Sequence, residues 1–504
     1  MSISLLLEMA MSGDPDRVAV VSETARHTTA ELNALADAGA GVINATGARS
    51  VAYVGMGGDM LPLLLFSAAR AGQPFAPLNY RLSGPALREL IDRLPAPLVV
   101  VDKEYRDLIS EAGDVGVALM DSDEFCAAAR TTAPDVQWPD PDDVAVILFT
   151  SGTTSRPKAV ELTHNNLTSY VTGTVEFGSA DASDAALICV PPYHVAGVGA
   201  ALSNLYAGRK MVYLRRFSAP EWIRLVAGER VTTATVVPTM LERIVAELEA
   251  HPTALPTLRN LAYGGSKVAL PLVRRALDLL PQVGFVNAYG LTETSSTVTV
   301  LTPEDHREAY ESGDEAVRRR LGSVGRPVPG LEVVIRDDDG RPVPAGQPGE
   351  LFVRGEQVSG TYTGIGSVLD ADGWFPTRDL AVLDDEGYLF IIGRSDDTII
   401  RGGENIAPAE IEDVLVEHPE VSQVAVVGAP DPEWGQIIVA CVVPAPGKSP
   451  DPAVLREYVR EQLRGSRTPD RIIFRPELPT TPTGKVLRRD IVSDLQNADI
   501  EGAQ

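Results

Sequence analysis

The stretch LFTSGTTSRPKAV at residues 148–160 joins an apolar run to a loop of small hydroxyl residues and glycine. The run at 144–149 is apolar and β-branched, which predicts a buried strand. In the loop, backbone N–H groups and hydroxyls can converge on phosphate oxygens, and Gly152 permits a close backbone approach. Lys158 adds a positive charge beside it. The stretch therefore predicts a polyphosphate site, with an ordinary polar surface loop as the alternative. It does not meet the P-loop consensus G-x-x-x-x-G-K-[ST].

Length and charge narrow the class of protein. A chain of 504 residues is too long for one compact core, so two or more domains are expected. The formal net charge of −25 argues against a nucleic-acid partner and against electrostatic attachment to a membrane, because both require basic surfaces. An anionic nucleotide must then be bound by local groups.

Cysteine usage and the apolar segments indicate the compartment. Cys126, Cys189 and Cys441 are widely separated and form no metal-binding spacing, which points to a reducing environment. The first twenty residues lack the basic region of a secretory signal. The apolar run at 60–66 is followed by Arg70 before it could span a bilayer. We expect a cytoplasmic protein without stable membrane insertion.

Strand and helix patterns alternate along the chain and predict an α/β fold. Residues 98–101 form a short apolar strand candidate, and 83–94 carry leucines at near-helical spacing. Two alternating runs within 333–355 flank a turn sequence at 337–340, which predicts a hairpin in an antiparallel β subdomain. Further along, the pattern predicts a helix that begins at Pro408 with Ile411, Val414 and Leu415 on one face, and then a strand at 424–427.

Six further motifs follow the phosphate loop in a fixed order. With the loop they extend over about 340 residues, and together they resemble the adenylate-forming superfamily, which includes acyl-CoA synthetases, nonribosomal adenylation domains and firefly-type luciferases. The motifs are PPYHVAGV at 191–198, AYGLTET at 288–294, GELFVRG at 349–355, WFPTRDLA at 374–381, GRSDDTIIRGGENIAPAEIE at 393–412 and PTGKVLR at 482–488.

The resemblance implies a domain organisation. We expect a large multi-subdomain N-terminal domain, with α/β layers plus a β subdomain, at 1–393. A hinge at 394–397, with Asp396 at its pivot, would lead to a smaller mobile α+β C-terminal domain at 398–504. A polar hinge tolerates a change of φ and ψ with little loss of packing. In the family, opposite faces of the small domain serve the two half-reactions.

The resemblance also implies where ATP and Mg²⁺ bind. Tyr289 would stack on adenine, Thr292 would lie near the α-phosphate, and Glu293 would hold Mg²⁺, which suits a single carboxylate with phosphate oxygens and waters. Asp379 would accept bonds from the ribose hydroxyls, with Arg394 near the ribose and phosphate. Taken singly, Thr292 and Glu293 could instead cap a helix, and Tyr289 could be a buried structural residue. Asp379 and Arg394 could each belong to an exposed ion pair. The remaining ATP-binding residues are expected at Thr150, Ser151, Gly152, Thr153, Thr154, Lys158, Gly264, Gly265, Ser266, Ala288 and Gly290.

Other residues are assigned by the resemblance to the two chemical steps. Lys485 would reach the α-phosphate and carboxylate during adenylation and stabilise charge that develops there. Gly402, Gly403 and Glu404 would line the path of the CoA thiol, and His194 would stand between the acyl pocket and that path. A solvated lysine and a core histidine are the ordinary alternatives. The acyl pocket is expected at His194, Val195, Gly197, Ala288 and Ser295.

The implied activity is ATP-dependent conversion of a carboxylic acid to acyl-AMP and then to acyl-CoA. The implied partners are small-molecule substrates, and a homodimer is compatible with the resemblance. Small residues and the lack of Arg or Lys in 194–203 and 287–300 favour a medium- or long-chain fatty acid or another apolar acid over a dicarboxylate.

Two alternatives remain open. One is a freestanding acyl-AMP ligase that loads a carrier protein, which the compact segment 355–377 disfavours; the other is a non-catalytic nucleotide-binding homologue. The chain ends nineteen residues after Lys485, so a fused carrier domain is not expected. Ser155, Ala159 and Arg378 stand where the family pattern has glycine, and side chains there would be disfavoured at positive φ.

Overall fold

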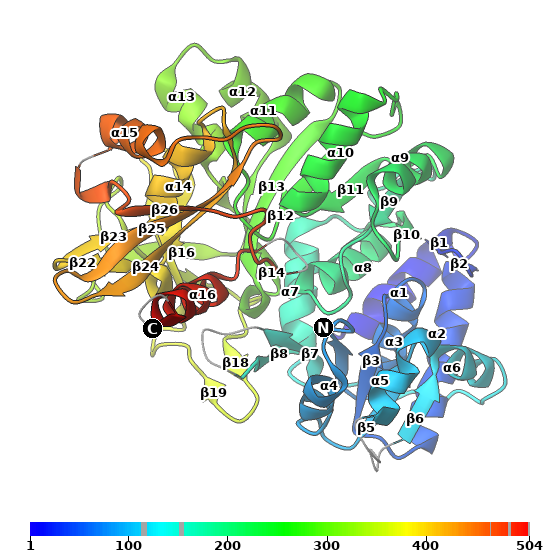
Figure 1. Cartoon of the computed structure of the whole chain (residues 1–504). Helices are drawn as coiled ribbons and strands as arrows, with labels where there is room; N and C mark the ends of the chain where they lie inside the picture. The colour runs from blue at the N-terminus through cyan, green and yellow to red at the C-terminus, as the bar shows by residue number, and fades with distance from the viewer. Residues whose placement is uncertain (112–117, 151–155, 464, 482–484, 502–504) are drawn as a thin grey trace.

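The computed structural model describes residues 1–111, 118–150, 156–463, 465–481 and 485–501 (Figure 1). Two large sheets with helices between and around them make up most of the N-terminal part, and a separate β sheet follows them. A smaller α+β unit, orange to red in Figure 1, forms the C-terminal part. The predicted α/β class, with a large N-terminal and a smaller C-terminal domain, is confirmed.

The first large sheet has nine strands within the described ranges. Its central strands are parallel, while β2, β14 and β15 run antiparallel to their neighbours. Neighbouring strands β12 and β13 end at the positions expected to contact adenine, because parallel strands bring their carboxyl ends to one edge. In spatial order the strands are β15 Arg326–Pro327, β14 Ser296–Leu301, β13 Gly284–Leu291, β12 Asn260–Gly264, β11 Thr233–Val236, β9 Ala185–Ile188, β10 Lys210–Tyr213, β1 Val18–Val21 and β2 Arg26–Thr28.

The second large sheet contains both strands that flank the predicted phosphate loop. The strand expected at 144–149 is β7, and the one expected at 98–101 is β5. β7 pairs antiparallel with β8, and Thr150 lies opposite Lys158, so the two ends of the loop are held together. Residues 151–155 lie outside the described residues. In spatial order the strands are β19 Gly366–Ser367, β18 Thr361–Tyr362, β8 Lys158–Thr163, β7 Val144–Thr150, β4 Phe75–Leu78, β3 Ser50–Val54, β5 Pro97–Val101 and β6 Ala118–Asp121.

Helices fill the space between the sheets and cover their outer faces. One buried cluster joins α1, α2, α3 and α8 to strands of both sheets; α9–α11 pack on the first sheet, and α4 on the second. The helix expected at 83–94 is α4, which ends at Ile91. The N-terminal helices are α1 Ile3–Gly13, α2 Thr29–Ala45, α3 Met60–Arg70, α4 Gly84–Ile91, α5 Arg106–Glu111, α6 Ser122–Ala129, α7 His164–Thr174, α8 Val195–Ala207, α9 Ala219–Gly228, α10 Pro238–Ala250, α11 Leu270–Leu279, α12 Pro303–Glu311 and α13 Glu315–Arg319.

Helix α3 accounts for the longest apolar run of the sequence. All of its residues are buried, and the fully buried Arg70 bonds to Asp37 at 2.5 Å and to Glu8 at 2.8 Å. The run is therefore a core helix that ends in a paired charge. Across the described residues, none of the helices combines the length and apolarity needed to cross a membrane.

A four-stranded antiparallel sheet forms the predicted β subdomain. Its strands are β16 Glu332–Arg336, β17 Gly349–Arg354, β20 Phe375–Leu383 and β21 Leu389–Arg394. β16 and β17 are the predicted hairpin pair, and Gly340 adopts the positive φ of +77° that the turn after β16 requires.

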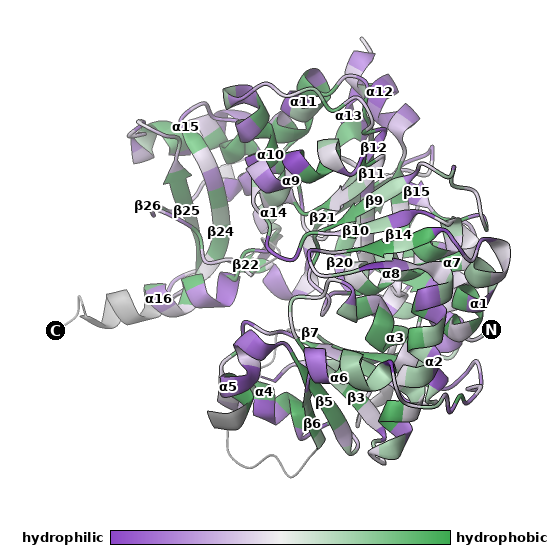
Figure 2. Cartoon of the chain, turned by 90° about the vertical axis from the view of Figure 1, so that its right-hand side faces the viewer, coloured by the Kyte–Doolittle hydropathy of each residue, from purple (hydrophilic) through white to green (hydrophobic). Residues whose placement is uncertain are grey.

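The C-terminal unit contains a short hairpin, a three-stranded sheet and three helices within its described part (Figure 2). The helix predicted from Pro408 is present, with Ile411 and Leu415 buried. The strand expected at 424–427 is longer, because it pairs along its whole length with the next strand. The elements are β22 Ile399–Arg401, β23 Glu404–Ile406, α14 Pro408–Val416, β24 Val421–Asp431, β25 Gly435–Pro444, α15 Pro452–Gln462, β26 Arg471–Phe474 and α16 Arg488–Glu501.

Candidate active site

Strands β20 and β21 bring the two predicted ribose residues together. Asp379 and Arg394 are direct partners in the register of these strands, and Arg394 Nη1 lies 3.2 Å from Asp379 Oδ1. Tyr289, from β13 of the first sheet, donates its hydroxyl to Asp379 Oδ2 at 2.5 Å. Arg394 and Tyr289, which belong to different sheets, therefore both bind the Asp379 carboxylate.

Burial is the largest influence on the pKa values of Asp379 and Tyr289. Burial raises the pKa of the Asp379 carboxyl, while Arg394 and the bond from Tyr289 act in the opposite direction. Burial, followed by the charge of Asp379, raises the pKa of the Tyr289 phenol well above its ordinary value. The phenol therefore keeps its proton and acts as a donor at neutral pH.

The carboxyl end of β12 lies against β13 with almost no space between the backbones. A Cβ on Gly264 would lie 2.2 Å from the carbonyl oxygen of Ala288, and a Cβ on Gly290 would lie 1.6 Å from that of Ser296. Gly265 follows with a φ of +85°. Gly264 and Gly290 admit only glycine and the φ of Gly265 favours it, so we call these three positions the glycine wall.

The predicted metal ligand and the phosphate-loop lysine contact one tyrosine. Glu293, in the 3₁₀ turn η2 Thr292–Thr294, accepts a hydrogen bond of 2.8 Å from the Tyr362 hydroxyl. Lys158 Nζ lies 5.3 Å from the centroid of the Tyr362 ring, within the range of a cation–π contact. Tyr362 lies outside the seven motifs, so sequence reasoning missed it.

The oxygen donors at Glu293 and Thr292 fit a hard cation such as Mg²⁺. Among the described residues, no group of three or more His, Cys, Asp or Glu side chains could hold a metal ion by itself. A magnesium ion here would therefore be held by Glu293 together with phosphate oxygens and waters, and it would neutralise charge on the phosphates.

The charges of Arg394 and Asp379 both act on the ammonium of Lys485. Burial, followed by the charge of Arg394, lowers the pKa of its ammonium, and Asp397 and Asp379 oppose that effect. The side chain still has an exposed surface, so solvent screens these interactions. Its backbone N–H donates to Thr481 Oγ1 at 3.0 Å. Its role in adenylation stays a prediction.

Two of the predicted thiol-path residues, Gly402 and Glu404, contact other residues of the C-terminal domain. Gly402 donates its N–H to the Trp434 carbonyl at 2.8 Å, and Glu404 pairs with Arg467. Gly402 and Gly403 have φ values of +58° and +84°. Their role toward a thiol stays a prediction.

His194 is a half-buried, neutral imidazole at the start of α8. Burial, followed by the charge of Arg81, lowers its pKa to about 4. Its ring centroid lies 4.6 Å from that of Tyr193. Within the described residues, His194 Nε2 and the Tyr193 hydroxyl are buried without a hydrogen-bond partner. Such groups are rare, and two side by side are suited to a bound substrate.

The other acyl-pocket candidates occupy different surroundings. Val195 and Gly197 lie in the first turn of α8, and a Cβ on Gly197 would lie 2.7 Å from the Pro191 carbonyl oxygen. Ser295 is fully buried and donates its hydroxyl to the Gln357 carbonyl at 2.8 Å. That hydroxyl is therefore occupied by the protein. The lining of the pocket stays a prediction.

The departures from the glycine pattern differ in consequence. Arg378 has a φ of +64°, which costs a residue with a Cβ about 1 kcal/mol. Its Nε lies 3.9 Å from Glu350 Oε1, and most of the side chain is exposed. Ala159 lies in β8 opposite Phe149, outside the left-handed region, so its methyl group adds no backbone strain. Ser155 lies outside the described residues.

A cavity of about 670 Å³ lies on the far side of Tyr193. Pro191 and Pro192 line it, together with Tyr80, which packs edge-on against Tyr193. Thr480 and Thr481 close it from the C-terminal domain. Among the described residues, its lining contains no carboxylate but four arginines, which are Arg81, Arg215, Arg216 and Arg243; Arg215 and Arg216 pair with carboxylates outside the lining. In a chain with a net charge of −25, this concentration of positive charge favours an anionic ligand.

A family model described as AMP-binding enzyme matches residues 7–363, and a model of the AMP-binding enzyme C-terminal domain matches residues 410–485. The chain belongs to the AMP-binding enzymes. This confirms the resemblance to the adenylate-forming superfamily.

Characterised AMP-binding enzymes align with most of the chain. The fatty acid--[acyl-carrier-protein] ligase ScoC from Streptomyces coeruleorubidus is 33% identical over 88% of this chain and 86% of the relative. Feruloyl-CoA synthase from an Amycolatopsis species is 34% identical over 92% and 93%. O-succinylbenzoate coenzyme A synthetase from Bacillus subtilis, solved with ATP and magnesium ion, superposes with a TM-score of 0.83 at 27% identity, over 96% of this chain and 98% of that one.

Proposed function

We propose that the chain is an AMP-forming acid–CoA ligase. In the first step a carboxylate oxygen attacks the α-phosphorus of ATP, and the bond to pyrophosphate breaks. In the second step the CoA sulfur attacks the acyl carbon, the bond to AMP breaks, and acyl-CoA is released. The observation that carries this proposal is the convergence of Arg394 and Tyr289 on the Asp379 carboxylate.

In the first step, Asp379 and Arg394 hold the ribose while Lys485 stabilises negative charge that develops at the α-phosphate. Glu293 would hold a magnesium ion that neutralises charge on the phosphates, and Tyr362 fixes one of the Glu293 carboxylate oxygens. His194, which is neutral at pH 7, separates the acid from the thiol path without adding a charge.

CoA is the acceptor that the cavity beside Tyr193 supports. CoA carries three phosphate groups, and arginine side chains bind phosphate well. The arginine-lined cavity lies between the large domain and the segment that leads to Lys485. Relatives named for CoA, such as feruloyl-CoA synthase, add support. A carrier protein is the second candidate, because one relative is named as an acyl-carrier-protein ligase.

For the acid we propose an apolar molecule. The residues expected around it, Val195, Gly197 and Ala288, are small and uncharged, and the imidazole of His194 is neutral. A cytoplasmic location and a homodimer also stay predictions.

A panel of carboxylic acids tests the proposal. ATP–pyrophosphate exchange with Mg²⁺ should appear with at least one acid, and AMP should be the nucleotide product. Adding CoA should then yield a thioester faster than adding a phosphopantetheinylated carrier protein. ADP as the main product would contradict adenylation, and the absence of exchange with every acid would favour a non-catalytic homologue. Faster transfer to the carrier protein would favour the second candidate.

A further inference from the structure

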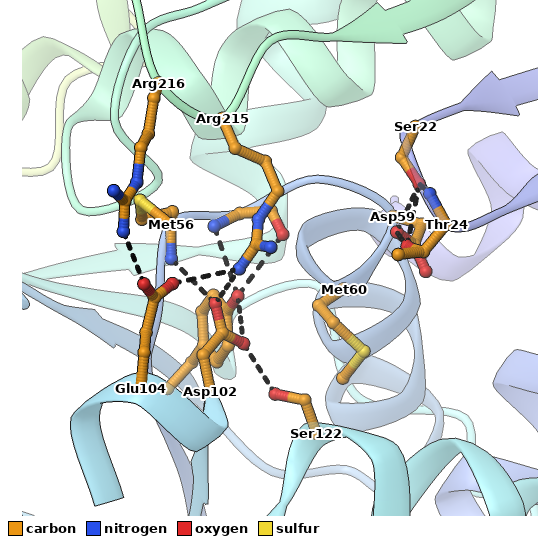
Figure 3. Close-up of polar contacts among 12 residues, drawn as sticks. Ser22, Thr24, Met56, Asp59, Met60, Asp102, Glu104, Ser122, Arg215 and Arg216 are labelled. Atoms are coloured by element: carbon orange, nitrogen blue, oxygen red, sulfur yellow. Dashed lines mark hydrogen bonds and ion pairs between the residues drawn. The ribbon is translucent and has the colours of Figure 1, made fainter.

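A buried carboxylate lies directly behind the arginine-lined cavity. Asp102 follows β5 and is only 5% exposed. It accepts hydrogen bonds from the Ser122 hydroxyl at 2.7 Å, the Met56 N–H at 3.0 Å and the Tyr53 hydroxyl at 3.1 Å. It also forms an ion pair of 2.6 Å with Arg215 Nη2 (Figure 3). Three separate segments of the large domain therefore converge on Asp102.

Arg215 connects this carboxylate to the cavity. One nitrogen of its guanidinium is held by Asp102, and the side chain lines the cavity wall. Its Nε is buried and lacks a partner within the described residues. The neighbouring Arg216 is held by Glu104 near the surface, and Glu104 also lies 3.5 Å from Arg215 Nη2 (Figure 3). Arg215 is therefore the cavity arginine whose orientation depends on a buried group.

The same carboxylate fixes the loop between β3 and α3, which forms another wall. The Met56 N–H is bound to Asp102, and the Gly57 N–H donates to the Tyr53 hydroxyl at 3.1 Å. A Cβ on Gly55 would lie 2.5 Å from the Asp102 carboxyl group, so the backbone rests on it. Gly57 and Gly58 both line the cavity with positive φ. Asp102 thus determines the position of two walls.

We propose that Asp102 is a positioning residue for the thiol acceptor. By holding Arg215 and the Met56–Gly58 loop together, it keeps the cavity in the shape and charge arrangement that bind the phosphates of CoA. The inference rests on the proposed function. It assigns Asp102 no contact with substrate, and it separates the acceptor step from adenylation, whose residues lie on other strands.

Two thiols and one variant test the proposal. Asp102→Asn keeps the size of the side chain but weakens its bonds to Arg215 and the hydroxyl donors. The KM for CoA should rise about tenfold, as expected for loss of a charge-assisted hydrogen bond. Pantetheine lacks the phosphates, so its turnover should change less than about twofold. ATP–pyrophosphate exchange, which needs no thiol, should also persist. A purely structural role would lower all three activities together.

Asp184→Asn is the matched control. Asp184 is also a buried carboxylate of the large domain and pairs with Arg259, but it does not line the cavity. This variant should leave the ratio of CoA to pantetheine turnover unchanged. If Asp102→Asn fails to fold, Ser122→Ala removes one bond to Asp102 and should shift the same ratio in the same direction by a smaller factor.

Three results would overturn the positioning role. An unchanged ratio of CoA to pantetheine turnover in both Asp102→Asn and Ser122→Ala would do so. An equal loss of turnover with both thiols would do so as well. A lower KM for CoA in Asp102→Asn would mean that the carboxylate only offsets the positive charge of the cavity. If the wild-type protein exchanged pyrophosphate but formed no thioester with either thiol, the CoA acceptor itself would be wrong and this inference would fall with it.

Discussion

The two sides of the nucleotide site are held by different means. On the large domain, Asp379 and Arg394 are paired in a strand ladder, and Tyr289 comes from a second sheet. On the C-terminal domain, the Lys485 backbone forms two hydrogen bonds with Thr481, and its side chain has an exposed surface. The fixed side suits groups that must bind the nucleotide in both half-reactions. The exposed side suits a group that is needed in one of them and must then leave.

The contacts between the domains agree with this difference. Lys267, next to the glycine wall, forms an ion pair of 2.6 Å with Asp413 on α14, and both side chains are about half exposed. Exposed pairs contribute little because solvent screens them. The Asp102–Arg215 pair within the large domain is buried and has further donors. The proposed rotation of the C-terminal domain would therefore break an ion pair that is weaker than the Asp102–Arg215 pair.

The largest expected effect comes from removing the movable charge. Lys485→Ala should slow adenylation by about 10²–10³-fold, the loss seen when a single donor to a transition state is removed. With preformed acyl-adenylate and CoA, thioester formation should stay near the wild-type rate. Rapid-quench assays of both steps measure this, with Lys448→Ala as a control on the same domain. Equal impairment of both steps would contradict domain alternation.

Breaking the fixed side should affect both steps. Asp379→Asn removes the charge that pairs with Arg394, and a lost charged hydrogen bond weakens binding by about 10–100-fold. We expect the KM for ATP to rise by that factor, and thioester formation from acyl-adenylate to slow as well. Asp370→Asn, which removes the charge that pairs with Arg336 in the same subdomain, is the control. Loss confined to adenylation would show that the ribose contact is not kept throughout the cycle.

The glycine loop offers the opposite selectivity to Lys485. In Gly403→Leu the new side chain has open space in the observed orientation, since nothing lies within 4 Å of a Cβ there. Adenylation should change little, whereas thioester formation should fall about tenfold or more through obstruction of the thiol path. Gly447→Leu is a close control, because it has a similar positive φ and an equally open Cβ position. A parallel loss of thioester formation in the control would assign the effect to backbone strain.

The smallest effect is expected at the interdomain pair. Lys267→Met should change the adenylation rate less than about fivefold, because exposed ion pairs contribute about 1 kcal/mol or less. A double-mutant cycle with Asp413→Asn, read by pyrophosphate exchange at low and high salt, isolates the pair. A coupling larger than this would mean that the orientation is locked and not merely favoured.

The sequence predicted the parts of the site that short motifs encode. Thr150 and Lys158 flank the phosphate loop on paired strands, and Asp379 with Arg394 forms the expected cluster, because each position depends on local backbone geometry. Tyr362 could not be predicted, since only the pairing of β18 with β8 brings it to Lys158.

Other features depended on information that sequence patterns lack. The four cavity arginines come from three segments with no common spacing, so only the folded chain gathers them. The sequence marked Arg378 as a departure, but its φ of +64° had to be observed. The strand around 424–427 was predicted too short because its partner, not its own composition, sets its length.

Arg488 would give the proposed movement of Lys485 a mechanical basis. Only three residues beyond the lysine, it donates to both carboxylate oxygens of Glu412, at 2.5 and 3.0 Å, and to Asp397 in the proposed hinge at 3.3 Å. The segment that carries Lys485 is thus attached to α14 and to the hinge at once. A turn at the hinge would therefore displace the lysine as part of a rigid body. Its conformational entropy is lost once, when the domain folds, and not again in every turnover.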